Sequence, residues 1–396
     1  MGTAAGPFAA FAGIGEIPTG DYPERTALEA AATAARMAVR DAGLDKSEID
    51  VIMPTGAIFN RDFNSDLIFG RLVEELGLNG TAHANIQVMA GGASGSAMAK
   101  TAAALVKSGL AKNVLCVHSD RLKSGIDIAT AIEVFSTLGI PDHWEQPFGQ
   151  HMGSMAAMLT NRYMYETGTT AEQLAAVCVS ARKWAELNPN AMFRKPLTVE
   201  EVLSSKVLSE PIHAKESNML ADGASAFVVT SVERAADLTD TPVYLTGASG
   251  RVTHYSLAQE MDIARMGYAD AAAEAFAMAG IGPKDIDIAE IYDAYPVINL
   301  IALEEMGLVE RGEAGAFVAS GGTFPGGALP MTTNGGMLSA GHTGAGGGVS
   351  IFVEALRQLM GKAGPRQVPG AKIAVETGSG GTYMDAQVMV LTNEVR

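Results

Sequence analysis

The stretch AARMAVRDAGLDKSEID at residues 34–50 returns in altered form as AAAEAFAMAGIGPKDID at residues 271–287. The alignment keeps a constant offset of 237 residues, from Ala42 to Ala279 and from Ile49 to Ile286. Each copy predicts an alanine-rich helix that ends where a glycine adopts the left-handed conformation. A short polar loop and an apolar strand follow, at Val51–Met53 and Ile288–Ile291. This helix–loop–strand unit is typical of layered α/β proteins.

The two copies continue in the same order. Residues 85–89 lead into a glycine-rich turn at 90–95, a helix at about 96–108 and a strand at 113–118. Residues 334–337 lead into a turn at 340–348, a helix at about 349–360 and a strand at 372–376. We therefore expect two homologous halves, residues 1–235 and 236–396. Residues of about 120–222 break the pattern and are too long for an ordinary connection, so we interpret them as a loop domain inserted in the first half, over the site.

Composition and charge exclude several classes of protein. A formal net charge of −16 argues against nucleic-acid binding, because neutralising phosphates requires a basic surface. No apolar run approaches the roughly 18 residues of a membrane span, and the N-terminus lacks a signal-peptide pattern, so we expect a cytoplasmic protein. Cys116 and Cys178 form neither a disulfide framework nor a CxxC metal pair, and we predict no metal site.

Motifs along nearly the whole chain resemble those of the thiolase superfamily. GGMLSAGHTGAGG (Gly335–Gly347) resembles the thiolase GGxxxxGHPxGxxG motif, and FGQHMGS (Phe148–Ser154) resembles the HMG stretch that lines the thiolase pocket. NMLADGA at residues 218–224 resembles the segment that closes the thiolase insertion, and EIYDAY at 290–295 stands where sterol carrier protein-type thiolases carry HDCF. The resemblance implies a thiolase fold, in which two βαβα halves form α/β/α/β/α layers.

The chain departs from this family at both catalytic cysteines. The thiolase nucleophile opens a helix in a CxSG turn, and the matching turn GASG makes Gly92 a vacant nucleophile position. The acid/base cysteine is missing from the final glycine-rich turn ETGSGG, which ends at Gly381. Claisen chemistry needs a covalent acyl carrier and a proton shuttle, so we do not expect thiolysis through an acyl-enzyme. Cys116 and Cys178 are expected to be small core residues.

The resemblance assigns the two residues that lie around the thioester oxygen to His342 and Tyr292. A neutral imidazole and a phenol can both donate a hydrogen bond to a developing oxyanion. The alternative interpretation of Tyr292 is a core tyrosine with a satisfied hydroxyl, and His151 is either a pocket wall or structural. Four residues are expected to support the site: His151, Asp293, Tyr295 and Gly381.

A cluster of basic residues interrupts the acidic sequence between 182 and 215. We predict that part of it contacts the phosphates of CoA, and the alternative is a solvated loop surface. The candidate CoA-binding residues are Arg182, Lys183, Arg194 and Lys195.

Aldol cleavage requires enolate stabilisation and acid/base chemistry but no acyl-enzyme. We therefore expect retro-aldol cleavage of a 3-hydroxyacyl-CoA to a ketone or aldehyde and a shortened acyl-CoA, with CoA as part of the substrate and no permanently bound cofactor. Thiolase-like aldolases that act on steroid side-chain CoA thioesters resemble this chain at Tyr292, but carry a second tyrosine in place of His342. Two alternatives remain: an acyltransferase with a different nucleophile or direct transfer, and a non-catalytic subunit of a complex.

The resemblance also implies an assembly. Thiolase-fold proteins pair as two-fold dimers through the first half, and the stretch at residues 84–89 suits a buried edge. The related aldolases work with a small companion that has an OB-fold and a zinc ribbon. The net acidity of this chain fits a basic partner of that kind.

Overall fold

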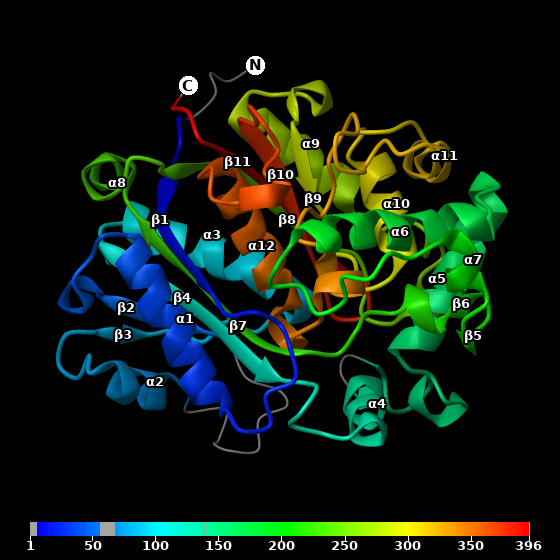
Figure 1. Cartoon of the computed structure of the whole chain (residues 1–396), viewed down its shortest axis with the longest axis horizontal. Coiled ribbons are helices and arrows are strands. Elements are labelled where there is room, and N and C mark those ends of the chain that lie inside the picture. Colours follow the sequence, from blue (N-terminus) through cyan, green and yellow to red (C-terminus); the bar gives the residue numbers. More distant parts are fainter. Residues whose placement is uncertain (1–5, 56–67, 138–139, 396) are drawn as a thin grey trace.

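The protein is described by a computed structural model that covers residues 6–55, 68–137 and 140–395. Nine strands of this part form one sheet in the order β3-β2-β4-β7-β1-β8-β11-β10-β9 (Figure 1). The strands that precede residue 235 are β1 (Ala9–Glu16), β2 (Val51–Pro54), β3 (Ala84–Asn85), β4 (Asn113–Arg121) and β7 (Asp222–Thr230). Those that follow are β8 (Val243–Val252), β9 (Ile288–Glu290), β10 (Ile373–Gly380) and β11 (Asp385–Thr392).

The two sides of this sheet repeat one topology. On the first side, β2 is parallel to β4, β4 is antiparallel to β7, and β7 is antiparallel to β1. On the second side, β9, β10, β11 and β8 pair in the same way. The antiparallel pair of β1 and β8 joins the two sides. This arrangement is the one expected from the sequence repeat, while the boundary at residue 235 stays a prediction.

The repeated unit is confirmed at the level of single residues. Helices α1 (Ala27–Asp41) and α9 (Tyr268–Ala279) are both followed by a left-handed glycine, Gly43 with φ +69° and Gly280 with φ +68°. A 3₁₀ turn comes next in each copy, at Lys46–Glu48 and Pro283–Asp285. A glycine is favoured at these helix ends because it has no Cβ to clash in the left-handed region.

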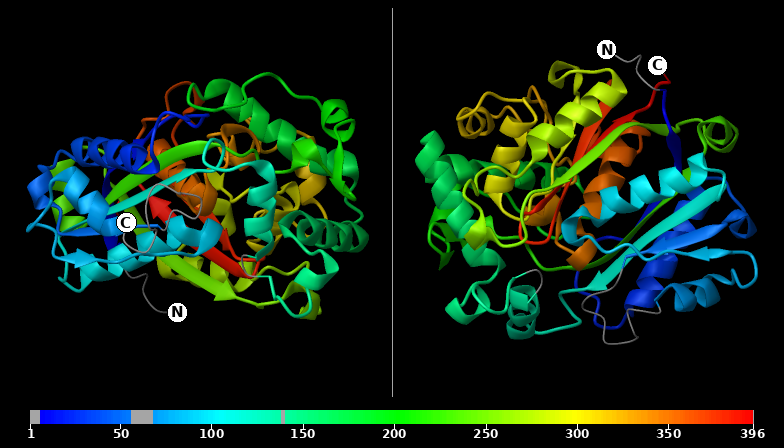
Figure 2. Two further views of the ribbon diagram at one scale, coloured as in Figure 1. Left: turned by 90° about the horizontal axis from the view of Figure 1, so that it is seen from below. Right: turned by 180° about the vertical axis from the view of Figure 1, so that it is seen from behind.

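The layers are those of a thiolase fold. Helices α3 (Ser94–Lys107) and α12 (Gly347–Leu359) pack together between the two sides of the sheet (Figures 1 and 2). Almost every residue of α12 is buried, as expected for a helix covered on all sides. Helices α1 and α2 (Ile68–Leu76) cover the outer face of the first side, and α9 covers that of the second. The α/β/α/β/α prediction is confirmed.

The insertion lies between β4 and β7 and packs on the second half of the chain. Its elements are α4 (Ile128–Thr137), α5 (Met152–Thr167), α6 (Ala171–Leu187), α7 (Val199–Leu203) and the hairpin β5 (Val207–Ser209)–β6 (Ile212–His213). Helices α5 and α6 contact α10 (Pro296–Glu305), and α6 also contacts α11 (Ala314–Ala319). Helix α8 (Val232–Leu238) follows β7. Segments far apart in sequence therefore meet where the insertion covers α10 (Figure 1).

One expected turn is wrong. ETGSGG, predicted as the final glycine-rich turn, is mostly strand, because β10 continues to Gly380 and the turn begins at Gly381. The glycines serve a close backbone approach instead. A Cβ built on Gly378 would lie 2.8 Å from the Cα of Ala93, and one on Gly380 would lie 2.5 Å from the carbonyl oxygen of Ala90. Glycine in a strand often marks such an approach.

The short strand β3 forms one edge of the sheet and pairs only with β2 among the described strands. Met89, at the end of the stretch predicted to form a buried dimer edge, is 47% exposed in this single chain. The described helices include none that is both long and apolar enough to cross a membrane.

Candidate active site

The ring of Tyr292 occupies the space beside Gly92. A Cβ built on Gly92 would lie 2.2 Å from two ring carbons of Tyr292 and 2.4 Å from its hydroxyl oxygen. Gly92 belongs to the 3₁₀ turn Gly91–Ala93, which leads directly into α3. The phenol therefore stands where the side chain of a nucleophile at position 92 would begin.

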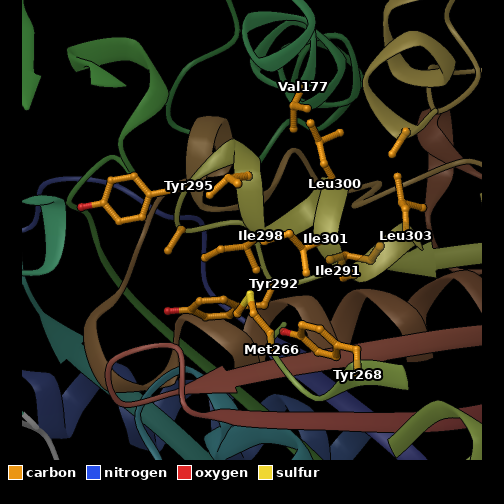
Figure 3. Close-up of a cluster of buried hydrophobic side chains, with 14 of the residues drawn as sticks. Val177, Met266, Tyr268, Ile291, Tyr292, Tyr295, Ile298, Leu300, Ile301 and Leu303 are labelled. Atoms are coloured by element: carbon orange, nitrogen blue, oxygen red, sulfur yellow. The ribbon is translucent and has the colours of Figure 1, made fainter. Parts of the chain in front are cut away.

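Tyr292 is held in the segment just after β9, two residues beyond the end of the strand. Its backbone N–H donates a hydrogen bond to the Thr377 hydroxyl at 3.1 Å, and its side chain is 7% exposed. The hydroxyl makes no hydrogen bond to any residue that the structure describes. Figure 3 shows the hydroxyls of Tyr292 and Tyr295 pointing to the same side, away from the aliphatic part of the buried cluster. Burial raises the pKa of Tyr292, and the neighbouring Asp293 and Tyr295 raise it further.

His342 lies in the loop before α12. Its backbone N–H donates to the carbonyl of Met219 at 2.6 Å, and its carbonyl accepts from the N–H of Ala221 at 2.9 Å, so the end of the insertion holds this loop. Its Nδ1 accepts a long hydrogen bond from the Gly344 N–H, at 3.4 Å. An acceptor at Nδ1 puts the ring proton on Nε2. Burial lowers the pKa of His342 to about 4, so the imidazole is neutral at pH 7.

Tyr292 and His342 meet at two consecutive glycines. A Cβ on Gly347 would lie 3.2 Å from Nε2 of His342, and one on Gly348 would lie 3.6 Å from a ring carbon of Tyr292. A Cβ on Gly348 would also lie 2.0 Å from the carbonyl oxygen of Gly92. The starts of α3 and α12 therefore pack backbone to backbone, with a phenol and an imidazole beside them.

Asp293 holds the turn that precedes His342. Its carboxylate accepts hydrogen bonds from the N–H groups of Met337 at 2.8 Å and Leu338 at 3.3 Å. Burial raises the pKa of Asp293 to about 7, while these two bonds act in the opposite direction. A Cβ on Gly336, which has φ +59°, would lie 1.9 Å from the carboxylate. These contacts are those of a residue that fixes the loop before His342. Asp293 can do this without touching a reacting group.

The remaining candidate supporting residues lie at the edge of the site. His151 caps the N-terminus of α5, where its Nδ1 accepts from the Gly153 N–H at 3.1 Å. The Tyr295 ring lies edge-to-face with that of Tyr383, with ring centroids 6.4 Å apart. Gly381, with φ +57°, opens the turn between β10 and β11.

Three nearby residues had not been singled out from the sequence. The Tyr383 hydroxyl donates to the carbonyl of Met152 at 2.9 Å, although its backbone has the unusual φ of +64°. Phe135 of α4 lies edge-to-face with His342 at 6.3 Å. His118 of β4 lies against Gly346, and burial lowers its pKa to about 3. None of these contacts has a signal in the local sequence, since each joins segments more than 190 residues apart.

Both cysteines are core residues, as predicted. Cys116 lies on β4 and Cys178 on α6, at 0% and 1% exposure. Burial raises the pKa of both thiols, which disfavours the thiolate required of a nucleophile. Among the described residues, no group of three or more His, Cys, Asp or Glu side chains is arranged to hold a metal ion.

The basic cluster is partly used within the chain. Arg182 donates to the Ser339 hydroxyl at 3.0 Å and to the Lys195 carbonyl at 2.8 Å, which connects it to the turn before His342. Arg194 donates to the carbonyl of Glu186 at 3.2 Å. Lys183 is exposed, with its ammonium 5.4 Å from the centre of the Phe324 ring. Contacts to CoA stay a prediction for these residues.

Comparison with known proteins agrees with this architecture. Residues 249–393 match a family described as thiolase C-terminal domain-like. An acetyl-CoA acetyltransferase of Methanothermobacter thermautotrophicus is 32% identical, over 90% of this chain and 91% of that protein. A steroid side-chain-cleaving aldolase of Thermomonospora curvata is also 32% identical, over 94% of this chain and 95% of that protein. A solved structure described as an Ltp2-ChsH2(DUF35) aldolase superposes with a TM-score of 0.84 at 30% identity, covering 98% of both chains.

The repeated fold, the loop that carries His342 and these similarities agree. The chain belongs to the thiolase superfamily. It is 32% identical both to a relative named as an acyltransferase and to one named as an aldolase.

Proposed function

We propose that this protein cleaves the Cα–Cβ bond of a 3-hydroxyacyl-CoA and releases a ketone or an aldehyde together with a shortened acyl-CoA. The observation that carries the proposal is at position 92, where a glycine stands in place of the thiolase nucleophile and faces the phenol of Tyr292. An acyl-enzyme needs a nucleophile, and both thiols of the chain are buried in the core. The relative named as a steroid side-chain-cleaving aldolase and the solved aldolase structure support the same class of reaction.

The proposed reaction moves one proton and consumes none. Burial raises the pKa of Tyr292, so its hydroxyl must lose a proton before the reaction begins. The phenolate then accepts the proton of the 3-hydroxyl group, and the Cα–Cβ electron pair becomes the enolate of the thioester as the carbonyl product leaves. The proton is then delivered to Cα, which restores the phenolate and completes the shortened acyl-CoA. The site must therefore stabilise negative charge first on a phenol oxygen and then on the thioester oxygen.

His342 is assigned to the thioester oxygen. Because its Nδ1 accepts from Gly344, its Nε2–H is free to donate to a developing oxyanion. Its pKa of about 4 keeps the ring neutral, so it acts as a hydrogen-bond donor without becoming a strong acid that would quench the enolate at oxygen. Asp293 keeps the preceding turn in place through its two N–H contacts.

An acyltransferase is the second candidate, because a relative of that name is also 32% identical, over 90% of this chain. The two functions differ in their products and in their use of free CoA, and acyl transfer through a nucleophile also forms an acyl-enzyme. The test is to incubate the purified protein with a panel of 3-hydroxyacyl-CoA and 3-ketoacyl-CoA thioesters, with and without free CoA. Aldol cleavage predicts a carbonyl product and a shortened acyl-CoA without consumption of free CoA, and no increase in the intact mass of the protein. An acylated protein, or cleavage that requires free CoA, would reject the proposal.

Steroid side-chain thioesters are the first substrates to try, since the aldolase relative is named for them.

A companion subunit is part of the proposal, because the solved neighbour is described by two names, Ltp2 and ChsH2(DUF35). We further propose a homodimer formed through the first half, near the edge strand β3. A monomeric mass by light scattering at micromolar concentration would contradict the dimer. The companion is tested by measuring the cleavage rate of the purified chain with and without the product of the neighbouring gene. A rate that does not change would contradict a required companion.

A further inference from the structure

We infer that Gly92 is a positioning residue: its missing side chain admits the phenol of Tyr292 to the start of α3, and that phenol excludes any nucleophile at position 92. The inference rests on the proposed function for its chemical meaning, but not for its geometry. The site can hold either the phenol of Tyr292 or a side chain at position 92, but not both.

The two groups cannot share the space. The built Cβ of Gly92 lies 2.2 Å from two ring carbons, far inside the distance that carbon atoms keep. The ring has little room to give way, because it is 7% exposed and belongs to the same buried cluster as Met266 and Ile298 (Figure 3). Gly348 lies on the same edge of the ring as Gly92, beside the neighbouring ring carbon. The backbone of Tyr292 is itself held, because its N–H donates a hydrogen bond to the Thr377 hydroxyl.

The backbone at Gly92 cannot retreat either. Its carbonyl oxygen lies against Gly348 at the start of α12, and the Cα of the next residue, Ala93, lies against Gly378 of β10. Opening the gap would separate α3 from α12, which together form the central layer of the fold. A side chain at position 92 must therefore displace the ring of Tyr292.

The requirement for glycine comes from space and not from backbone conformation. Gly91 has φ +55°, in the left-handed region that favours glycine, whereas Gly92 does not lie in that region. Position 92 should therefore accept a side chain as soon as the ring of Tyr292 is removed. Position 91 should not, which makes it the matched control.

The location of the phenol has a chemical consequence. α3 is a helix of 14 residues, and the Tyr292 hydroxyl lies beside the turn that begins it. The N-terminus of a helix carries a partial positive charge that favours an anion. The side chain of Tyr292 is more than nine-tenths buried, and its hydroxyl makes no hydrogen bond within the described residues. The start of the helix thus favours the phenolate and opposes part of the effect of burial, at the place where a thiolate would otherwise stand.

The first experiment measures stability and is independent of any activity. Gly92→Ala is compared in the wild-type chain and in the Tyr292→Ala background, with Gly91→Ala in both backgrounds as the control. Gly92→Ala should lower the melting temperature by a few degrees, or prevent folding, only when the ring is present. Gly91→Ala should be equally harmful in both backgrounds. Equal loss from Gly92→Ala in both backgrounds, or failure of both Gly92→Ala variants to fold, would overturn the inference while leaving the aldolase proposal standing.

The second experiment asks whether the excluded nucleophile can be restored. Gly92→Cys and Gly92→Cys/Tyr292→Ala are incubated with acetyl-CoA, and the intact mass and the modified peptide are determined. In the double variant the Cys sulfur should attack the thioester carbonyl, the C–S bond to CoA should break, and the thiol proton should leave with CoA as its free thiol. We expect an acetyl group on residue 92 of the double variant and none on the single variant or on Tyr292→Ala alone. Equal acetylation of the single and double variants would show that the ring does not exclude a nucleophile.

Discussion

Helices α3 and α12 occupy matching places in the two halves of the fold, and the turns at their starts are built differently. The turn before α3 presents Gly92 and no reactive side chain, whereas the loop before α12 presents His342. The phenol that faces Gly92 comes from the segment that follows β9, so both proposed reacting groups belong to the second half of the chain. The repeat thus supplies two helix N-termini to one site. The chemistry is decided by which side chain stands at each of them.

Removal of the side chain beside α12 should have the largest effect. His342→Ala should lower the rate of carbon–carbon cleavage by about 100- to 1,000-fold, the usual cost of one lost oxyanion donor. Combination with Tyr292→Phe should cost less than the product of the two single losses, because residues that act on one transition state are not additive. Single-turnover rates of the two single variants and the double variant check this, and strictly multiplicative losses would argue for separate roles.

The next largest effect is expected from Asp293, which holds the turn before His342. Asp293→Asn replaces one acceptor by a donor and leaves the N–H of Met337 or Leu338 without its partner. Such a buried unsatisfied group costs about 1–3 kcal/mol of unfolding free energy. Denaturant unfolding measures this loss, and the cleavage rate should fall with it because the loop positions His342. An unchanged rate together with lower stability would separate Asp293 from the site.

Helices α3 and α12 each have a buried carboxyl group close by, and the two groups have different partners. Glu354 of α12 has a guanidinium partner, with 2.8 Å between its Oε2 and Nη2 of Arg366, whereas Glu376 beside α3 accepts from the Ser96 hydroxyl at 2.9 Å. Burial raises the pKa of Glu376 from 4.5 to about 8. The folded state therefore holds this proton when the unfolded state has lost it, so this group's contribution to stability falls as the pH rises from 4.5 to 8.

Glu376→Gln removes that titration and keeps an acceptor for Ser96. The stability of the variant relative to the wild type should rise across this window, with a slope of up to about 1.4 kcal/mol per pH unit. Urea unfolding of both proteins at several pH values measures the difference. A difference that stays constant with pH would show that Glu376 is ionised in the folded state.

The smallest effect is expected for the two thiols. Cys116→Ala/Cys178→Ala removes small core side chains that lie outside the proposed chemistry. Stability should fall modestly through the two small cavities, while the cleavage rate should stay within about twofold of the wild type. Loss of turnover in a variant that melts normally would identify a thiol as the nucleophile.

The sequence predicted the repeat and its elements because periodicity and helix-ending glycines are local signals. The left-handed Gly43 and Gly280 and the burial of both cysteines were expected from short stretches of sequence. The turn at ETGSGG was wrong because glycines in a strand that touches another backbone look the same as glycines in a turn.

The candidate site shows the same limit. His342 and Tyr292 were predicted from motifs, whereas the contact of Tyr292 with Gly92 joins residues 200 positions apart and has no local pattern. Tyr383 was missed for a similar reason, since its partner Met152 lies in the insertion. Side chains that meet across the fold need coordinates.

The central claim, that the phenol of Tyr292 performs the chemistry from the place of the lost nucleophile, is tested most directly by Tyr292→Phe. This change removes a hydroxyl without a hydrogen bond among the described residues and keeps the ring against Gly92, so the melting temperature should stay the same. The single-turnover cleavage rate of a 3-hydroxyacyl-CoA should fall by about 100-fold or more. A variant that folds normally and cleaves at close to the wild-type rate would show that the phenol is structural and would contradict the mechanism.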